Sequence, residues 1–138
     1  MPFWKCYYHT VWSTIGRLPL ITPEVEKIAI EVIKRKSNEL NCPILAINGT
    51  TDHIHIAVSI TPSVSVAEWI RSVKGLSTHE INTVIPDLSS PFKWQKSYGV
   101  LSYGEKLLPF VVAYVENQKE HHANNSIQPY LELMDSSE

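Results

Sequence analysis

The stretch from Asp52 to Ile60 constrains the fold of this chain more than any other part of its sequence. It reads DHIHIAVSI, with an apolar residue at every second position. Alternation of this kind is typical of a β-strand, in which successive side chains point to opposite faces of a sheet. Four residues of the strand share one face and four share the other: Ile54, Ile56, Val58 and Ile60 against His53, His55, Ala57 and Ser59. We therefore expect the first face to pack on helices and the second to carry chemistry.

The sequence around this strand predicts three more strands and three helices. Thr22 as an N-cap followed by Pro23 predicts a helix that reaches about Leu40, and the box from Ser65 to Glu68 opens a second helix. Asn48-Gly49 predicts a tight hairpin turn before the histidine strand. The remaining expected elements are strands over 4–13, 44–47 and within 92–102, and a helix from about 107 to 122. This order predicts an α+β fold, an antiparallel sheet with helices packed on it.

Length and composition point to one soluble domain. We expect residues 1–138 to form a single domain, with about 125–138 as a flexible tail. The longest apolar run, 107–115, is too short to span a membrane, and the first residues lack the features of a signal peptide. The two cysteines form no Cys-x-x-Cys pair and suit a reducing compartment, so we predict a cytoplasmic protein.

The overall charge is a mild argument against nucleic-acid binding. The formal net charge is −2 and the isoelectric point is near 6.3, whereas phosphate contacts usually come from a basic surface. The chain nevertheless contains twelve Lys and Arg residues, which are enough to line one groove if they cluster.

The segment FVVAYVENQKEHH, residues 110–122, carries a second chemical motif. On a helix of 3.6 residues per turn, Tyr114 and Gln118 lie one turn apart and project from the same face. A phenol that could act as a nucleophile and an oxygen that could bind a metal would therefore lie side by side. With an ordinary pKa near 10, the phenol needs a nearby cation or base for activation.

The two motifs together supply the ligands of a metal site. His53, His55 and the Gln118 oxygen would give a divalent cation three ligands and leave positions open for phosphate oxygens and water. A carboxamide in place of a thiolate or carboxylate favours Mg²⁺ or Mn²⁺ over zinc. Each residue also has an ordinary alternative: a satisfied or exposed histidine pair, a core tyrosine and a solvated glutamine.

Five segments of the chain resemble the single-tyrosine HUH transposases, which include insertion-sequence enzymes and the REP-associated tyrosine transposases. They are YHTVWSTIGRLPL, DHIHIAV, RSVKGLST, FKWQKSYGV and YVENQKEHH, in this order. The resemblance implies the ferredoxin-like HUH endonuclease fold, with His53 and His55 as the HUH pair, Gln118 as the third ligand of Mg²⁺ or Mn²⁺ and Tyr114 as the nucleophile. It also implies a homodimer in which the tyrosine helix can serve the histidine pair of the partner subunit.

The implied reaction is the cleavage and rejoining of hairpin-bearing single-stranded DNA. Tyr114 would attack a phosphodiester, leaving a 5′-phosphotyrosine and a free 3′-hydroxyl, and the 3′-hydroxyl of a second strand would reverse the step. Seven further residues are candidates for DNA contact: Arg17, Arg71, Lys74, Trp94, Lys96, His121 and His122. Core packing is the alternative for Trp94, solvent exposure for the basic residues and helix capping for the histidine pair.

Two other functions compete with strand transfer. A domesticated or inactive relative would bind a DNA or RNA hairpin without cutting it, although the intact Tyr114, His53, His55 and Gln118 argue against this. A metal-dependent phosphoesterase that uses water would not need Tyr114.

Overall fold

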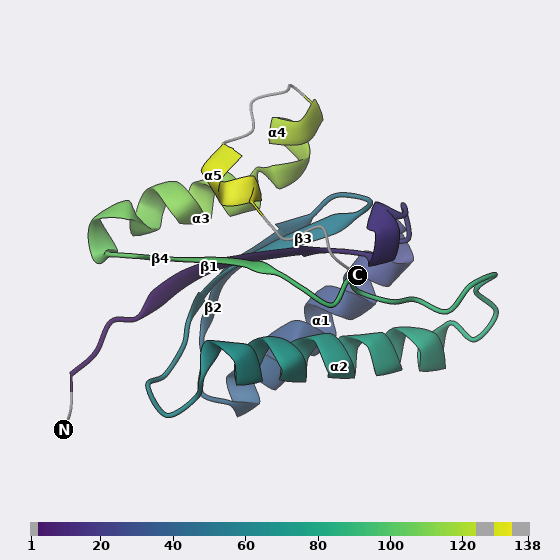
Figure 1. Cartoon of the computed structure of the whole chain (residues 1–138), viewed down its shortest axis with the longest axis horizontal. Helices are drawn as coiled ribbons and strands as arrows, with labels where there is room; N and C mark the ends of the chain where they lie inside the picture. The colour runs from purple at the N-terminus through teal and green to yellow at the C-terminus, as the bar shows by residue number, and fades with distance from the viewer. Residues whose placement is uncertain (1–2, 124–128, 134–138) are drawn as a thin grey trace.

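A computed structural model describes residues 3–123 and 129–133, and it has an antiparallel sheet of four strands with helices on both faces (Figure 1). The strands are β1 (Tyr7–Ser13), β2 (Ile44–Gly49), β3 (His53–Ser59) and β4 (Gly99–Tyr103). The α-helices are α1 (Pro23–Glu39), α2 (Val66–Val84), α3 (Leu108–Glu116), α4 (Gln118–Ala123) and α5 (Pro129–Glu132), and the short 3₁₀ helices are η1 (Ile15–Arg17) and η2 (Glu105–Leu107). The predicted α+β fold is confirmed.

The histidine strand β3 is an inner strand of the sheet. The order is β2-β3-β1-β4, and every neighbouring pair is antiparallel. In the register between β1 and β3, Ser13 lies opposite His53 and Val11 lies opposite His55. Every residue of β3 is buried because strands flank it on both sides and helices cover both faces. An inner position explains why even the two histidines and the serine of this strand are buried.

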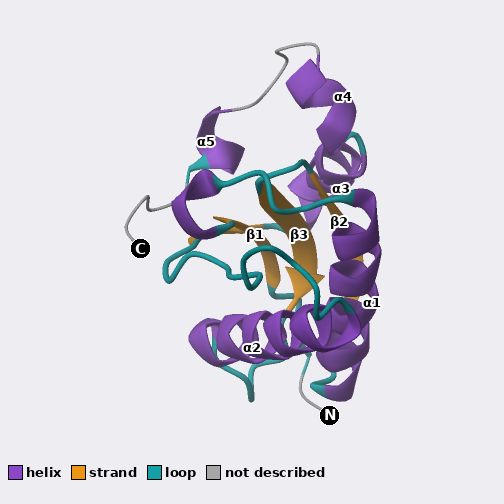
Figure 2. Ribbon diagram, turned by 90° about the vertical axis from the view of Figure 1, so that its right-hand side faces the viewer, coloured by secondary structure: helices purple, strands orange, loops and turns teal. Residues whose placement is uncertain are grey.

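The two faces of β3 meet different helices, as its alternation predicts. Ile54, Ile56 and Val58 join the main core with residues of α1 and α2. Ala57 belongs to a smaller cluster with Val111 and Val115 of α3. Figure 2 shows the sheet between the α1–α2 layer on one side and α3, α4 and α5 on the other. The imidazoles therefore face the layer that carries the tyrosine.

Both predicted helix starts are formed by the expected caps. The Thr22 side chain accepts a hydrogen bond from the Val25 amide, and the Ser65 side chain accepts one from the Glu68 amide. Trp69 is fully buried on α2, where its indole Nε1 donates to Ser37 Oγ of α1 at 2.9 Å. The two longest helices are thereby joined beneath the sheet.

The hairpin turn predicted at Asn48-Gly49 lies about two residues further along the chain. Asn48 and Gly49 are the last residues of β2 and pair with His55 and Ile54, so the chain turns over residues 50–52 instead. The Asn48 side chain accepts from the Gly49 amide and donates to the Glu116 carbonyl, which favours extended backbone here. Gly49 is required for space, because a Cβ would lie 2.5 Å from the His53 carbonyl oxygen.

The predicted continuous helix over 107–122 is divided at Asn117. Tyr114 lies on α3 and Gln118 begins α4, so the one-helix argument for their shared face does not hold. Asn117 leaves the helical conformation at φ −101° and ψ 24°, and its side chain donates to the Ala113 carbonyl. Side-chain bonding of this kind competes with regular helix hydrogen bonding.

Part of the segment expected to be a tail lies against the sheet. Within residues 129–133, Leu131 of α5 is only 2% exposed. A Cβ on Gly99 would lie 1.8 Å from the Leu133 carbonyl oxygen, so the absence of a side chain on β4 lets the C-terminal segment pass. None of the described helices is long and apolar enough to cross a membrane.

Candidate active site

The candidate active site is built on one face of β3. His53 and His55 are 1% and 0% exposed, and their ring centroids are 5.1 Å apart. Their two-residue spacing places both imidazoles on the same face of the strand, as predicted. Because the strand is held on both sides, the two rings are fixed before any ligand arrives.

A carboxylate and a third histidine orient the two rings. His53 Nδ1 lies 2.6 Å from Asp52 Oδ1, and His55 Nδ1 lies 2.8 Å from His9 Nε2 on β1. Both Nε2 atoms consequently face away from these partners and toward α3 and α5. Partners on the second ring nitrogen set the tautomer of metal-binding histidines.

The protonation of these partners follows from burial and charge. Burial and the neighbouring His55 lower the pKa of His9 to about 3, so His9 is neutral. Burial lowers the pKa of His53, but hydrogen bonds to Glu132 and Asp52 outweigh it, so the pKa is raised above its usual value. Burial raises the pKa of Glu132, but the bonds to His53 and His55 outweigh that effect and keep the carboxylate ionised.

The Glu132 carboxylate connects the histidine pair to the tyrosine. Its Oε1 lies 3.0 Å from His55 Nε2 and 3.4 Å from His53 Nε2. Its other oxygen accepts a hydrogen bond from the Tyr114 hydroxyl. The Tyr114 ring also meets the His55 ring edge-on, with centroids 6.0 Å apart. The Glu132 carboxylate therefore contacts the candidate nucleophile and both imidazoles.

The carboxylate oxygen lies at metal-ligand spacing from each of the two imidazoles. His53, His55 and Glu132 each offer one ligand atom, and these atoms lie within 4.8 Å of one another. Two donors at about 2.1 Å from one cation, at angles of about 90–110°, are about 3.0–3.4 Å apart. The carboxylate oxygen lies 3.0 and 3.4 Å from the two Nε2 atoms, and both distances match this range.

Gln118 is buried without satisfying its carboxamide. The residue is 0% exposed, and neither Oε1 nor Nε2 finds a hydrogen-bond partner in the part of the chain that the structure describes. A buried polar group left unpaired costs about 1–3 kcal/mol. This cost indicates that the carboxamide serves a group other than the described residues.

The other predicted DNA contacts fall in three places. Arg17 lies near the histidines, with its guanidinium 3.6 Å from Asp52 Oδ1. Arg71, Lys74 and Lys96 line a separate groove beside α2. Trp94 borders the same groove but is packed in the core, where its Nε1 donates to Ser77. His121 and His122 fall in the last turn of α4, and their side chains lie outside the described part of the structure.

Sequence reasoning missed Glu132 and the roles of Asp52 and His9. Asp52 directly precedes His53, and metal-binding histidines commonly donate to a carboxylate, so its position was a usable signal. His9 could not be paired with His55 before the register of β1 and β3 was known. Glu132 stands between Leu131 and Leu133 in a short segment without a longer pattern, and no local signal assigned it to the site.

Fold and site together define a class of α+β protein with a tyrosine beside a buried histidine pair. The sequence matches the family model described as IS200-like transposases over residues 2–118, and the chain belongs to this family. It is 21% identical to the ISDra2 transposase TnpA of Deinococcus radiodurans over 117 residues, which cover 82% of this chain and 84% of that protein. The chain is thus a transposase by family, as the resemblance predicted.

Solved structures agree on the fold. A crystal structure from Deinococcus radiodurans R1 superposes with a TM-score of 0.70 at 24% identity and covers 85% of this chain and 93% of that chain. A REP-associated tyrosine transposase bound to a REP hairpin has a TM-score of 0.65 at 14% identity, covering 100% of this chain and 92% of that one.

Proposed function

We propose that the protein cleaves and rejoins single-stranded, hairpin-bearing DNA through a covalent link to Tyr114. One observation carries the proposal: the Glu132 carboxylate contacts the Tyr114 hydroxyl and both histidine Nε2 atoms. A nucleophile and a cluster able to hold a cation are thus adjacent within one chain. Membership of a transposase family and the hairpin bound by the REP-associated neighbour support DNA of this kind as the substrate.

The inferred chemistry is a reversible exchange of phosphodiester bonds. The Tyr114 oxygen attacks the phosphorus, a P–O(Tyr) bond forms, and the bond from phosphorus to the 3′ oxygen breaks. The phenol proton leaves Tyr114 and a proton is taken up by the departing 3′ oxygen, so the products are a 5′-phosphotyrosine and a 3′-hydroxyl. Attack by a second 3′-hydroxyl reverses the sequence and restores the phenol without an external energy source.

We infer that His53, His55 and Glu132 hold a divalent cation, Mg²⁺ or Mn²⁺, with the Gln118 carboxamide as a further donor. Imidazole, carboxylate and amide ligands are compatible with these ions. When bound, the cation offsets negative charge on the phosphate oxygens. Asp52 and His9 orient the two imidazoles toward it, and the buried surroundings of Tyr114 keep bulk water from competing with the phenol.

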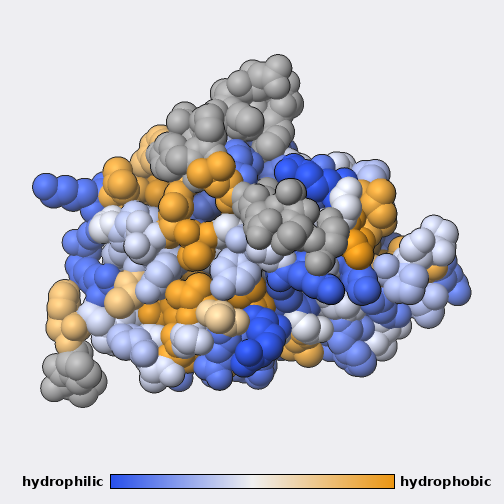
Figure 3. Space-filling model, viewed as in Figure 1, coloured by the Kyte–Doolittle hydropathy of each residue, from blue (hydrophilic) through white to orange (hydrophobic). Residues whose placement is uncertain are grey.

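We also infer a homodimer. β4 ends the order of strands in the described sheet, and its Val100 and Leu101 are 37% and 38% exposed. Figure 3 shows hydrophobic residues gathered over this part of the surface. A Leu101→Glu variant should shift the protein toward monomer in light scattering after size exclusion, whereas an unchanged mass would exclude this edge as the interface.

The decisive experiment is adduct formation on a denaturing gel. The protein is mixed with 3′-labelled hairpin oligonucleotides and Mg²⁺ or Mn²⁺, beside Tyr114→Phe, His55→Ala and the matched control Tyr103→Phe. A label that moves with wild type and the control, but with neither site variant, supports the proposal.

The same gel separates the competing functions. A hairpin-binding relative would bind the oligonucleotide and form neither adduct nor cleaved product. A hydrolase would still cut with Tyr114→Phe, because water replaces the phenol. Either pattern would contradict the covalent mechanism.

A further inference from the structure

A cavity of about 290 Å³ lies between the start of α1, the turn that joins β2 to β3, and α4. Six residues line it: Ile21, Pro23, Glu26, Thr50, Thr51 and Lys119. The cavity adjoins the candidate active site, because Thr50 Oγ1 lies 2.9 Å from His53 Nδ1. Lys119 of α4 and Glu26 of α1 both border this space, so whatever joins them also determines how α4 lies beside the site.

The Lys119 side chain ties α4 to two other elements. Its ammonium donates to Glu26 Oε2 of α1 at 2.8 Å and to Asn48 Oδ1 of β2 at 2.7 Å, partners that are 93 and 71 positions away in the sequence. Asn48 in turn donates to the Glu116 carbonyl at the end of α3, at 2.9 Å. The chain on both sides of the break at Asn117 is therefore bonded to β2.

This contact joins the helices of the two faces of the sheet. α1 belongs to the layer on one face and α4 to the layer on the other (Figure 2). β2 is the last strand in the order of the described sheet, so the two helices meet past its edge. The pair formed by Lys119 and Glu26 closes that edge.

Gln118, the residue before Lys119, has a reason to leave its buried position. It is 0% exposed, and neither polar atom of its carboxamide finds a partner among the described residues. Burial of such a group is unfavourable, because water would satisfy both atoms. α4 has only six residues and is separated from α3 by the break at Asn117, so its own helical hydrogen bonds do little to hold it. The bonds of Lys119 oppose this tendency.

We propose that Lys119 is a positioning residue, which together with Glu26 and Asn48 holds α4 against its own chain and keeps Gln118 buried at the candidate metal site. The part of Gln118 as a metal donor rests on the proposed function, whereas the clamp formed by these three residues does not. Lys119 itself contacts neither the cation nor the substrate in this role. Its side chain is 59% exposed, which makes it accessible to substitution without a change in the core.

The first test asks whether the clamp holds α4. Hydrogen–deuterium exchange of the peptide over 117–123 is measured in EDTA for Lys119→Met and for Glu26→Gln. Lys106→Met, at an exposed lysine of η2, and Glu24→Gln, which removes the other carboxylate from the first turn of α1, are the matched controls. We expect exchange to be about fivefold faster in both clamp variants, as for the loss of one charge-assisted hydrogen bond near the surface, and unchanged in both controls.

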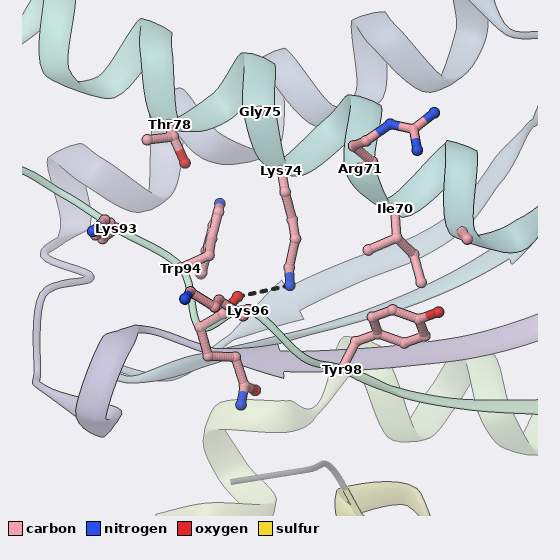
Figure 4. A pocket seen from close by; sticks show the side chains of 11 residues that line it. Ile70, Arg71, Lys74, Gly75, Thr78, Lys93, Trp94, Lys96 and Tyr98 are labelled. Atoms are coloured by element: carbon pink, nitrogen blue, oxygen red, sulfur yellow. Dashed lines mark hydrogen bonds between the residues drawn. The ribbon is translucent and has the colours of Figure 1, made fainter. Parts of the chain in front are cut away.

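Another bridging lysine provides a control on the opposite face of the sheet. Lys74 of α2 donates to the carbonyls of Gln95 and Ser97, both at 2.8 Å, as Figure 4 shows for Gln95. α2 covers the face opposite the one that carries α3 and α4 (Figures 1 and 2). Lys74→Met removes a bridging ammonium, as Lys119→Met does, but it should leave exchange in α4 unchanged. Equal acceleration by both variants would indicate general loosening of the fold.

The second test uses the sign of the effect on cation binding. Removing a positive charge by itself favours a cation, and removing a negative charge disfavours it. If the clamp positions Gln118, Lys119→Met and Glu26→Gln should both weaken Mn²⁺ binding, about threefold to tenfold by isothermal titration calorimetry. Lys119→Arg keeps a charged donor in reach of both oxygens and should retain the affinity of the wild type.

The route through Gln118 is tested by a double variant. On a Gln118→Leu background, Lys119→Met should cause little further loss of Mn²⁺ affinity, because both substitutions act through one group. A loss of equal size on both backgrounds would show that Lys119 does not act through Gln118.

Two other outcomes would overturn the proposal. One is equal exchange in Lys119→Met and Lys106→Met. The other is an affinity that rises in Lys119→Met and falls in Glu26→Gln, which is the pattern of charge alone. If the wild type binds no Mn²⁺, the proposed metal site fails, while the exchange comparison still decides whether Lys119 and Glu26 hold α4.

Discussion

The two nitrogens of the His55 ring face different partners, and this division makes His9 part of the site. His55 Nε2 lies 3.0 Å from Glu132, and Nδ1 lies 2.8 Å from His9 Nε2. For Nε2 to ligate a cation, the ring proton must be on Nδ1, from which it donates a hydrogen bond to His9 Nε2. Because its pKa is lowered to about 3, His9 is neutral and its Nε2 is able to accept that hydrogen bond.

Replacing His9 by leucine should therefore weaken cation binding without touching a ligand. We expect Mn²⁺ affinity, measured by isothermal titration calorimetry, to fall about 10–100-fold, the usual effect of losing a partner of a metal-binding histidine. His9→Gln keeps an acceptor and should recover most of the affinity. Equal affinity in His9→Leu and wild type would show that the contact is packing alone.

Gln118 should have opposite effects on stability and on cation binding. Leucine in its place removes two buried polar atoms that lack partners in the described chain. We expect Gln118→Leu to raise the free energy of unfolding in urea with EDTA by about 1–3 kcal/mol. The same variant should bind Mn²⁺ more weakly. Lower stability without metal would mean that the carboxamide has a structural partner instead.

At the scale of elements, the C-terminal segment reaches the site because β4 lacks a side chain at Gly99. A Cβ there would overlap the Leu133 carbonyl oxygen, and Leu133 follows Glu132 directly. Gly99→Ala should displace α5 and remove the Glu132 carboxylate from the histidine pair.

We expect Gly99→Ala to lower Mn²⁺ affinity about as much as Glu132→Gln does, although residue 99 contacts no ligand. The double variant should then lose little more than either single variant, because both act through one group. Gly104→Ala, where a Cβ meets nothing, is the matched control. Additive losses would show that Gly99 acts by another route.

The helices and strands also differ in how far local sequence predicts them. The caps at Thr22 and Ser65 bond to amides three residues further on, and the alternation in β3 is a local pattern as well. The two long helices and the central strand can therefore be predicted from sequence. The break at Asn117 and the turn after Gly49 depend on contacts between α3 and β2, such as that of Asn48 with Glu116. Glu132 meets residues 77 positions away in sequence, a distance that no periodicity encodes.

For the whole molecule, net charge is a poor guide to where charge acts. The negative total suggested little affinity for nucleic acid, but sheet and helix packing bring residues 71–74 and 93–96 to one groove. Lys74 lines this groove without an acidic residue in the lining, and burial lowers its pKa to about 8.

This lowered pKa predicts how the stability of the folded chain depends on pH. Between about pH 8 and 10.5 Lys74 is largely neutral in the folded protein and protonated in the unfolded chain, so unfolding takes up a proton. Raising the pH through this window therefore opposes unfolding at this residue. We expect the free energy of unfolding of wild type, relative to Lys74→Met, to increase from pH 8 to 9.5 in urea titrations.

Burial raises the pKa of Tyr103 to about 12, so the unfolding free energy of either protein alone falls with pH above about pH 10, but this contribution cancels in the difference between wild type and Lys74→Met. Lys27→Met, at an exposed lysine of α1, should run parallel to wild type throughout. If the difference between wild type and Lys74→Met is instead constant with pH, the Lys74 ammonium keeps an ordinary pKa. Lys74→Arg, which stays charged across this range, should likewise lack the increase in unfolding free energy that wild type shows.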